Sequence, residues 1–440
     1  MRHRLLDWLR AGFALVALLA PAAGQAAAGW TFHPVPEANA VALGVLWQHG
    51  FDDDAPAECG AARVLAECRL RRARAAAPDV LASGLQVLAD ASIVFVLVER
   101  QHSRRGVAFV AALLDERLPL GDDDLALAQA RAALDADDAE FLWPGLVLQS
   151  QARRALCAGQ PAWRAAAGSA VAIQALTRAR IGALLAAPVA ATGMVLGAVD
   201  AELREALATL PLPGGARSAP PAAVAPPSPV AGTSIEHDRV NAPTVGAAFA
   251  VPQGVDLAAF ALGVEVARAR AQQRFRFRAN EGVARTPFVS WSWLHGDPVL
   301  LFCRRGVSPK RMLPGERGGV PAAAESAATR RELEALLTDL REVPPTADEV
   351  RAAQRGLRME LALAPVGPET LAALAGTAEA LPGRLQVLLL AAHRRIDGVA
   401  LENATPAAVH AALVAALAPA AAYWAELLPR PQASLAWRPR

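Results

Sequence analysis

A proline-rich segment near the middle of the chain constrains the fold more than any other feature. Seven prolines lie between positions 211 and 229 of the 440 residues. Each proline removes a backbone donor and fixes φ, so a segment this rich in proline favours extended backbone and cannot form a core. We therefore assign residues 211–232 to a linker between two domains of nearly equal length, residues 29–210 and 233–440.

The two domains have the same order of expected elements. Residues 40–47 (AVALGVLW) and 243–251 (PTVGAAFAV) are apolar runs too short for a typical helix, and turn-forming residues bound them, as is typical of buried strands. Further strands are expected over residues 91–99 and 288–303, and long helices over 104–116, 125–136, 325–340 and 348–363. This order predicts an α+β fold of two similar domains, each a mainly antiparallel sheet with helices packed on one face.

Threonine side chains mark the starts of three helices. Thr346 and Glu349 have the spacing of a capping box, and Thr177 and Thr405 each stand directly before an expected helix. Such hydroxyls accept hydrogen bonds from the open amides of the first helical turn. The first domain is expected to close with a strand and turn over residues 193–200 and a helix over residues 201–210.

The first 28 residues have the organisation of a secretory signal peptide. Three arginines, Arg2, Arg4 and Arg10, flank an apolar run over residues 11–20, and small residues surround the expected cleavage point near Ala28. No later segment offers about twenty apolar residues, the length that a membrane span needs. We expect a periplasmic or secreted protein; an uncleaved membrane anchor is the alternative.

Composition and cysteine spacing exclude several classes of function. A hydrophobic fraction of 54% with 20% charged residues is typical of a folded protein, and a net charge of +2 argues against a nucleic-acid partner. The four cysteines have the spacing of neither a zinc finger nor a redox pair. We expect buried free thiols, with a long-range disulfide as the alternative. These cysteines are Cys59, Cys68, Cys157 and Cys303.

Residues 59–68 (CGAARVLAEC) have the pattern of a metal-binding helix without its ligands. In the inverted zinc motif H-x-x-E-H, two histidines bind the ion and the glutamate activates a water molecule. Arg63 replaces the first histidine, Ala66 the glutamate base and Glu67 the second histidine. A guanidinium cannot bind zinc and alanine cannot accept a proton. The sequence therefore predicts a degenerate site in which Arg63 and Glu67 form an i,i+4 ion pair.

Other segments indicate a resemblance to a known family. Residues 175–202 are similar to the "alt-r-d-l…vvGdvd-e" run, residues 277–286 (FRANEGVART) to the "LRe-x-x-Gl-a-Y-s" segment, and residues 343–350 (VPPTADEV) to the "vteeEl" helix start. These runs and the degenerate motif occur in the family's order around the central linker. The chain thus resembles the pitrilysin, insulinase and mitochondrial processing peptidase family of zinc metallopeptidases, in its short two-domain form.

The resemblance implies that the metal site is lost. The family takes a third zinc ligand, a glutamate, from a later helix of the first domain. Alignment on the acidic pair at residues 137–138 puts Arg131 or Ala130 at that position, with Glu116 and Glu140 as alternatives if the gap lies elsewhere. The eight histidines form no i,i+4 pair. We therefore expect no cofactor in this chain, with zinc in a partner chain.

The resemblance also suggests substrate-binding residues in the second domain. In relatives that work as pairs, the zinc-free chain supplies an arginine and a tyrosine that hold the substrate. Arg278 falls on the arginine position, Arg285 replaces the tyrosine, and Tyr423, the only tyrosine, is remote in the sequence. We predict that Arg278 and Arg285 bind substrate; the alternative is that neither has a substrate role.

Together these features favour a catalytically inactive subunit. It would form a heterodimer with a zinc-bearing paralogue, or a homodimer, and enclose peptide substrates. One alternative is a scaffold protein without a role in proteolysis, as in family members built into respiratory complexes. Another is an active peptidase that uses ligands outside the motif.

Overall fold

The computed structural model describes most of the chain after the expected signal peptide. The described residues are 29–35, 37–115, 121–141, 144–157, 168, 170–187, 189–215, 232–237, 240, 242–276, 288–292, 297–306, 322–360, 381–394 and 398–430. The expected signal peptide, residues 1–28, and residues 216–231 of the expected linker lie outside them. None of the helices in this part of the chain combines the length and apolar character of a membrane span.

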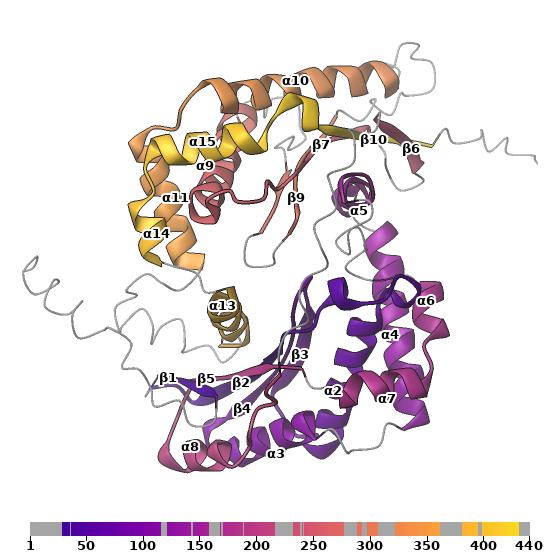
Figure 1. Ribbon diagram of the computed structural model, residues 1–440, viewed down its shortest axis with the longest axis vertical. Helices are drawn as coiled ribbons and strands as arrows, with labels where there is room; N and C mark the ends of the chain where they lie inside the picture. Colours follow the sequence, from indigo (N-terminus) through magenta and orange to yellow (C-terminus); the bar gives the residue numbers. More distant parts are fainter. Residues whose placement is uncertain are drawn as a thin grey trace, which may run out of the picture.

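Two five-stranded sheets with the same topology form the framework (Figure 1). The first sheet has the order β1-β5-β2-β4-β3 and the second β6-β10-β7-β9-β8. In each sheet the first two strands of this order pair in parallel and the other neighbours are antiparallel, so the sheets are mixed. The strands are β1 (Trp30–Pro34), β2 (Ala40–Trp47), β3 (Ala82–Val87), β4 (Ser92–Glu99), β5 (Ala191–Gly197), β6 (Thr233–His237), β7 (Thr244–Ala250), β8 (Phe288–Ser290), β9 (Val299–Arg305) and β10 (Tyr423–Pro429).

The expected helices begin close to their predicted starts. Thr177 and Thr405 each accept a hydrogen bond of 3.2 Å from a first-turn amide, which confirms both caps. The α-helices are α2 (Ala61–Ala76), α3 (Ser103–Leu114), α4 (Asp122–Phe141), α5 (Pro144–Leu156), α6 (Ala170–Ala175), α7 (Arg178–Ala186), α8 (Ala201–Ala208), α9 (Leu257–Arg276), α10 (Ala322–Glu342), α11 (Ala347–Glu360), α13 (Leu381–Arg394), α14 (Gly398–Asn403) and α15 (Pro406–Ala416). Helices α5, α9 and α13 were not among those expected.

Both faces of each sheet carry helices, so the prediction of helices on one face holds only for those that each half packs on its own sheet. Helices α2 and α3 cover one face of the first sheet, and α13, from the second half of the chain, covers the other. In the second sheet α10 packs on one face and α5, from the first half, on the other. Figure 1 shows α13 and α5 in these exchanged positions between the two sheets. Neither half of the chain therefore closes its own sheet.

The central strand β2 explains why a second helical layer is needed. Every residue of β2 is buried. Val41, Leu43 and Val45 join the core on the α2 and α3 side, whereas Ala42 and Leu46 join the core that contains Leu385 and Leu389 of α13. Because successive side chains of a strand point to opposite faces, an unbroken apolar strand has to be covered twice.

Glycine lets each exchanged helix approach its sheet closely. A Cβ at Gly44 of β2 would lie 2.8 Å from Leu385 Cδ2 of α13. In β7, the central strand of the second sheet, a Cβ at Gly246 would lie 3.2 Å from Leu148 Cδ1 of α5. The same device thus occurs at both exchanged contacts.

We expect Gly44→Phe to weaken the contact between α13 and the first sheet. Overpacking a filled core costs about 1–3 kcal/mol, so the free energy of unfolding in urea should fall by that amount. Gly182→Ala in α7 is the control: nothing lies within 4 Å of that position, and we expect no loss. Equal stability of Gly44→Phe and the wild type would contradict the close packing.

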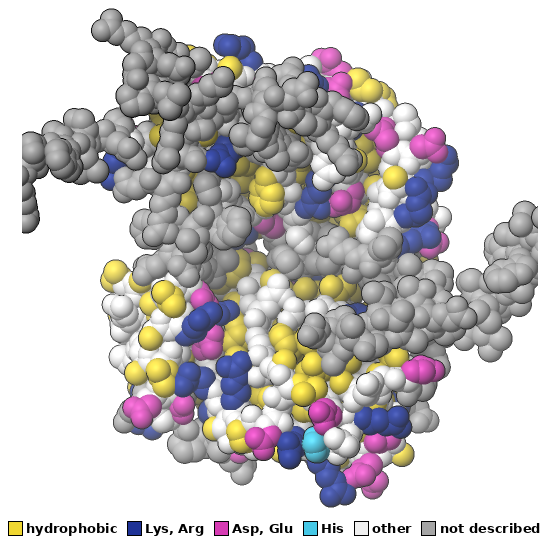
Figure 2. Space-filling model, turned by 180° about the vertical axis from the view of Figure 1, so that it is seen from behind, with side chains coloured by type: hydrophobic (Ala, Val, Ile, Leu, Met, Phe, Trp, Pro, Cys, Tyr) yellow, Lys and Arg dark blue, Asp and Glu magenta, His cyan; other side chains and the backbone are white. Residues whose placement is uncertain are grey.

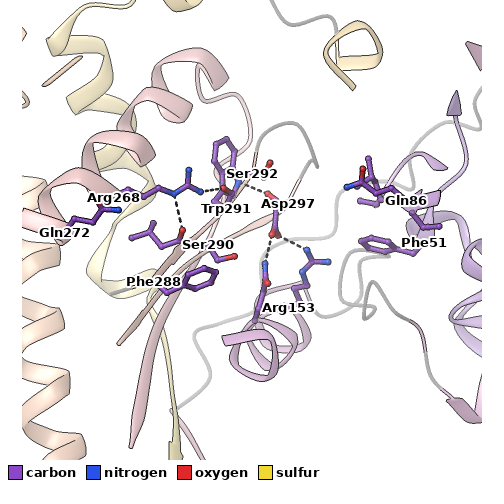
Figure 3. A pocket seen from close by; sticks show the side chains of 15 residues that line it. Phe51, Gln86, Arg153, Arg268, Gln272, Phe288, Ser290, Trp291, Ser292 and Asp297 are labelled. Carbon is purple, nitrogen blue, oxygen red and sulfur yellow. Dashed lines mark hydrogen bonds and ion pairs between the residues drawn. The ribbon is translucent and has the colours of Figure 1, made fainter. Parts of the chain in front are cut away.

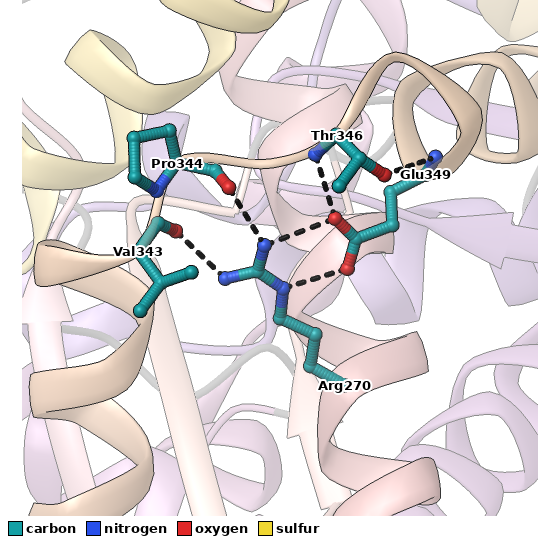
Figure 4. A network of polar contacts seen from close by, with 5 residues as sticks. All are labelled: Arg270, Val343, Pro344, Thr346 and Glu349. Carbon is teal, nitrogen blue, oxygen red and sulfur yellow. Dashed lines mark hydrogen bonds and ion pairs between the residues drawn. The ribbon is translucent and has the colours of Figure 1, made fainter.

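A polar network joins α9 to the start of α11 (Figure 4). The Arg270 guanidinium donates to both carboxylate oxygens of Glu349, at 2.7 and 3.0 Å, and to the carbonyls of Val343 and Pro344. The Thr346 amide donates to Glu349 at 2.7 Å and the Glu349 amide to the Thr346 hydroxyl, which confirms the capping box. The hydrogen bonds from Arg270, and then that from the Thr346 amide, lower the pKa of Glu349 to about 2.

This lowered pKa predicts a pH-dependent loss of stability. The contribution of Glu349 is complete above its ordinary pKa of 4.5 and is lost as the pH falls towards about 2. Glu349→Gln should therefore lower the free energy of unfolding by about 1–2 kcal/mol at neutral pH, and by less at pH 3. Asp348→Asn, at an exposed neighbour, is the control. If Glu349→Gln lowers the free energy of unfolding by the same amount at pH 7 and at pH 3, the ionisation of Glu349 does not contribute to stability as predicted.

Candidate functional site

The degenerate motif lies on α2, whose start is firmly held. The buried Asp54 carboxylate accepts hydrogen bonds of 2.8 Å from the amides of Gly60 and Ala62, where the helix dipole favours a negative charge. Gly60 has a φ of 106°, which disfavours other residues. A Cβ there would also lie 2.5 Å from Ile173 Cγ1 of α6. These contacts fix the direction of the motif helix.

Arg63 lies between two carboxylates. Its Nη2 donates to Glu67 Oε1 at 2.9 Å, which confirms the predicted ion pair, and to Asp135 Oδ2 of α4 at 2.5 Å. A second guanidinium, that of Arg131, lies 3.4 Å from the other oxygen of Asp135. Ala66 is buried and presents no polar group to this cluster. The cluster therefore joins α2 to α4 by charge.

Asp135 is the residue of this cluster that the sequence analysis missed. Alignment pointed to Arg131 or Ala130, whereas the structure turns Asp135, one helical turn after Arg131, towards the motif. The side chain of Glu140, and Glu116, lie outside the described residues. The i,i+4 spacing of Arg131 and Asp135 was the available signal, but only the packing of α4 on α2 shows that Asp135 faces Arg63.

This arrangement does not fit a zinc ion. Zinc sites in proteins are built from neutral imidazoles, thiolates and carboxylates. Here the guanidinium of Arg63 has its Nη2 between the two carboxylates and neutralises charge that a metal would need. Nowhere in the described residues do three or more histidine, cysteine, aspartate or glutamate side chains gather as a metal site would require. All four cysteines are buried and form no disulfide within the described residues, and burial raises the pKa of Cys68 to about 12.

The predicted substrate-binding arginines cannot be placed, because Arg278 and Arg285 lie outside the described residues. Tyr423 is buried on β10, and its hydroxyl donates to Thr233 on β6 at 2.8 Å. It therefore joins two strands of the second sheet.

A cavity of about 610 Å³ opens between the two halves (Figure 3). Its walls come from the end of β3 and the following turn, from β8 and the residues after it, and from α5 and α9. Both β3 and β8 are edge strands, at equivalent positions in the two sheets. Phe51 and Phe288 supply aromatic surface, and Phe288 is 56% exposed. Exposed aromatic surface in a cavity between domains is typical of a ligand site.

The two edge strands differ in what they offer a ligand. The Leu88 amide donates to the Ala91 carbonyl at 2.8 Å. In an antiparallel pair, every second residue of a strand forms hydrogen bonds with the partner strand. The backbone groups of Leu85 and Val87, at odd spacing from Leu88, therefore point away from β4. In β8, by contrast, Arg268 donates to the carbonyls of Val289 and Trp291. Among the described residues, no strand pairs with the edge of β3 at Leu85 and Val87, beside the cavity, although Arg74 donates to the carbonyl of Ser83 further along this strand. The edge of β8 is covered by the Arg268 side chain.

A second charged cluster forms the wall near α5. Asp297 accepts hydrogen bonds from Gln149 at 2.5 Å and from Arg153 at 2.9 Å, and its backbone carbonyl accepts from the Trp291 indole at 2.8 Å. The Arg153 guanidinium also lies 5.6 Å from the centre of the Phe51 ring. Residues from both halves of the chain therefore meet at this wall.

Comparisons with known proteins support the fold. The sequence matches no protein-family model and no curated protein. The structure is similar to a protease from Helicobacter pylori, with a TM-score of 0.67, 15% identity, and coverage of 91% of this chain and 97% of that chain. It is also similar to the inactive domain of a peptidase M16 from Pseudomonas fluorescens, with a TM-score of 0.65, 16% identity, and coverage of 91% and 95%.

A third similar structure is a chain of complex III from Candida albicans, with a TM-score of 0.64, 11% identity, and coverage of 90% and 93%. The chain therefore has the α+β fold of the M16, or pitrilysin-type, peptidases. The predicted resemblance is confirmed at the level of the fold. Because similar structures include a protease, an inactive domain and part of complex III, the fold leaves the function to be argued from the site.

We expect removal of the Arg63 charge to destabilise the junction of α2 and α4. Arg63→Ala leaves the carboxylates of Glu67 and Asp135 facing each other, which should cost about 1–3 kcal/mol in urea unfolding. Adding Glu67→Gln and Asp135→Asn to the Arg63→Ala variant removes the repulsion and should restore part of the lost free energy of unfolding. Arg131→Ala, at a mostly exposed side chain, is the control and should cost less than about 0.5 kcal/mol. If Arg131→Ala lowered the free energy of unfolding more than Arg63→Ala does, Arg63 would not be the main ion-pair partner of these carboxylates.

Proposed function

We propose that this chain is a catalytically inactive subunit that binds peptides and associates with a zinc-bearing peptidase of the same fold. The observation that carries the proposal is the Arg63 cluster, in which a guanidinium stands where the motif requires a metal ligand and Ala66 where it requires a base. A chain with these residues cannot activate a water molecule at this place. Peptide cleavage then depends on a partner that retains H-x-x-E-H.

The cavity supports peptide as the ligand. An extended peptide can add to an open sheet edge, where main-chain hydrogen bonds supply affinity for many sequences. The backbone groups of Leu85 and Val87 offer such an edge beside a cavity with aromatic and polar walls. We propose that peptides bind here as an added strand next to β3. Arg278 and Arg285 remain proposed substrate-binding residues, and a periplasmic or secreted location remains part of the proposal.

Co-expression tests the partnership. The product of a neighbouring gene with an intact H-x-x-E-H should co-purify with this chain, and a fluorogenic peptide should be cleaved faster by the pair than by the partner alone. This chain alone should contain no stoichiometric zinc by metal analysis, with a chelator-treated sample as the control. Lack of association would favour the homodimer, and peptidase activity of the isolated, metal-loaded chain would refute the proposal.

A proline at the edge of β3 tests the peptide site. Val87→Pro removes an outward-facing amide, and edge strands tolerate proline at such positions, so the fold should be retained. We expect peptide affinity, measured by fluorescence anisotropy, to fall about tenfold. The variant loses the hydrogen bond from the Val87 amide, and the adjacent main-chain hydrogen bond becomes less well aligned. Val87→Thr keeps the amide and the side-chain shape and should bind as the wild type does. Equal binding by both variants would exclude pairing at this edge.

The similarity to a chain of complex III favours a second candidate, a scaffold without a peptide ligand. Arg278→Ala and Arg285→Ala separate the two functions. These changes should impair a partnered peptidase, but they should leave the assembly of a scaffold unchanged when complexes are compared by size-exclusion chromatography.

A further inference from the structure

In the part of the chain that the structure describes, one buried nitrogen in the cavity wall has no hydrogen-bond partner. Arg153 of α5 lines the cavity and is only 9% exposed. Its Nη2 donates to Asp297, but its Nη1 is buried and has no acceptor among the described residues. A buried donor without an acceptor destabilises the folded state, so native proteins rarely retain one without a reason.

The surrounding contacts hold this guanidinium in place. Asp297 Oδ1 accepts from Arg153 and from the Val299 amide, and Oδ2 accepts from Gln149. The carboxylate that positions Arg153 is therefore fully engaged. Figure 3 shows Arg153 and Phe51 facing each other at the boundary of the two halves.

The charges of the cavity favour an anionic group. Its charged lining residues are Arg153, Arg268 and Asp297, which gives a net charge of +1. Arg268 uses its nitrogens on Glu265 and on the carbonyls of Val289 and Trp291. Of these two arginines, Arg153 is thus the one that retains an unused N–H. Guanidinium groups bind carboxylates through charge-assisted hydrogen bonds.

We propose that Arg153 binds a carboxylate of the peptide, an inference that rests on the proposed function. The carboxylate can be the C-terminus of the peptide or the side chain of an aspartate or glutamate. Because Nη1 is shielded from water in this conformation, Phe51 or the guanidinium shifts slightly as the oxygen approaches. The cost of this shift offsets part of the favourable interaction. We therefore expect the bond between Arg153 and the carboxylate to raise peptide affinity about tenfold.

Three pools of fluorescein-labelled decapeptides test the assignment by fluorescence anisotropy. The first pool has free C-termini and no acidic residues, the second is the same pool with amidated C-termini, and the third is amidated and contains aspartate and glutamate. Each pool is titrated with wild-type protein, with Arg153→Gln and with Arg153→Lys. Lysine keeps the positive charge, but its single nitrogen cannot replace both Nη1 and Nη2 of the guanidinium. Arg154→Gln, at the exposed neighbour on α5, is the matched control.

Tighter binding of the first pool than the second assigns the C-terminal carboxylate, and tighter binding of the third assigns an acidic side chain. In either case the preference should disappear in Arg153→Gln, weaken in Arg153→Lys and persist in Arg154→Gln. Arg153→Lys retains a partner for Asp297, so it reports on the site even if Arg153→Gln fails to fold. Equal binding of all pools overturns this inference alone. Absence of binding to every pool overturns the peptide-binding function and this inference with it.

Discussion

The exchange of α5 and α13 is the constraint on which the rest of the structure depends. Each central strand is apolar on both faces, and each half of the chain contributes the helix that covers the second face of the other sheet. Separating the halves would expose both of these faces to water, at roughly 25 cal/mol for each Å² of apolar surface. The halves are therefore held opposite each other, and the cavity between their edge strands is a consequence of this packing.

The Arg63 cluster joins two helices by charge at the place where the motif would require metal ligands. A zinc ion between α2 and α4 would join the two helices through its ligands. Here a guanidinium joins them instead, with Glu67 on one side and Asp135 on the other. Two carboxylates that face each other without a cation repel, so the position of Arg63 has to carry positive charge for this pair to persist. The cluster thus supplies the cohesion of a metal site without its Lewis acidity.

The local elements could be predicted from the sequence because their causes are local. The apolar run of β2 gave its bounds, and Thr177, Thr346 and Thr405 marked helix starts through their own hydroxyls. The two sheets could be recognised as similar for the same reason. The cover of both sheet faces was missed, because an apolar strand does not say which helix packs on it. The run over residues 288–303 was expected as one strand signal, whereas the structure has two strands there, β8 and β9, the second of which continues to Arg305.

The candidate site was harder to predict because it is built from long-range contacts. The degenerate motif was visible in ten residues, but Asp135 meets Arg63 only through the packing of α4, and Arg153 meets Phe51 only through the exchanged helix α5. The parallel pairing of β1 with β5 likewise brings together segments more than 150 residues apart. No spacing rule in the sequence reports such contacts.

The two sheets have the same topology but different edges, so the two walls of the cavity offer different groups to a bound peptide. Arg268 occupies the carbonyls of β8, whereas the open amide of Val87 faces outward near the end of β3. Arg153 lies at that same end, because Phe51, the ring beside it, donates its amide to the carbonyl of Leu88 at 2.9 Å. A peptide whose C-terminal carboxylate reaches Arg153 would then run parallel to β3, whereas an acidic side chain would leave both directions open. Only binding of the C-terminal carboxylate at Arg153 would therefore fix the direction of the bound chain.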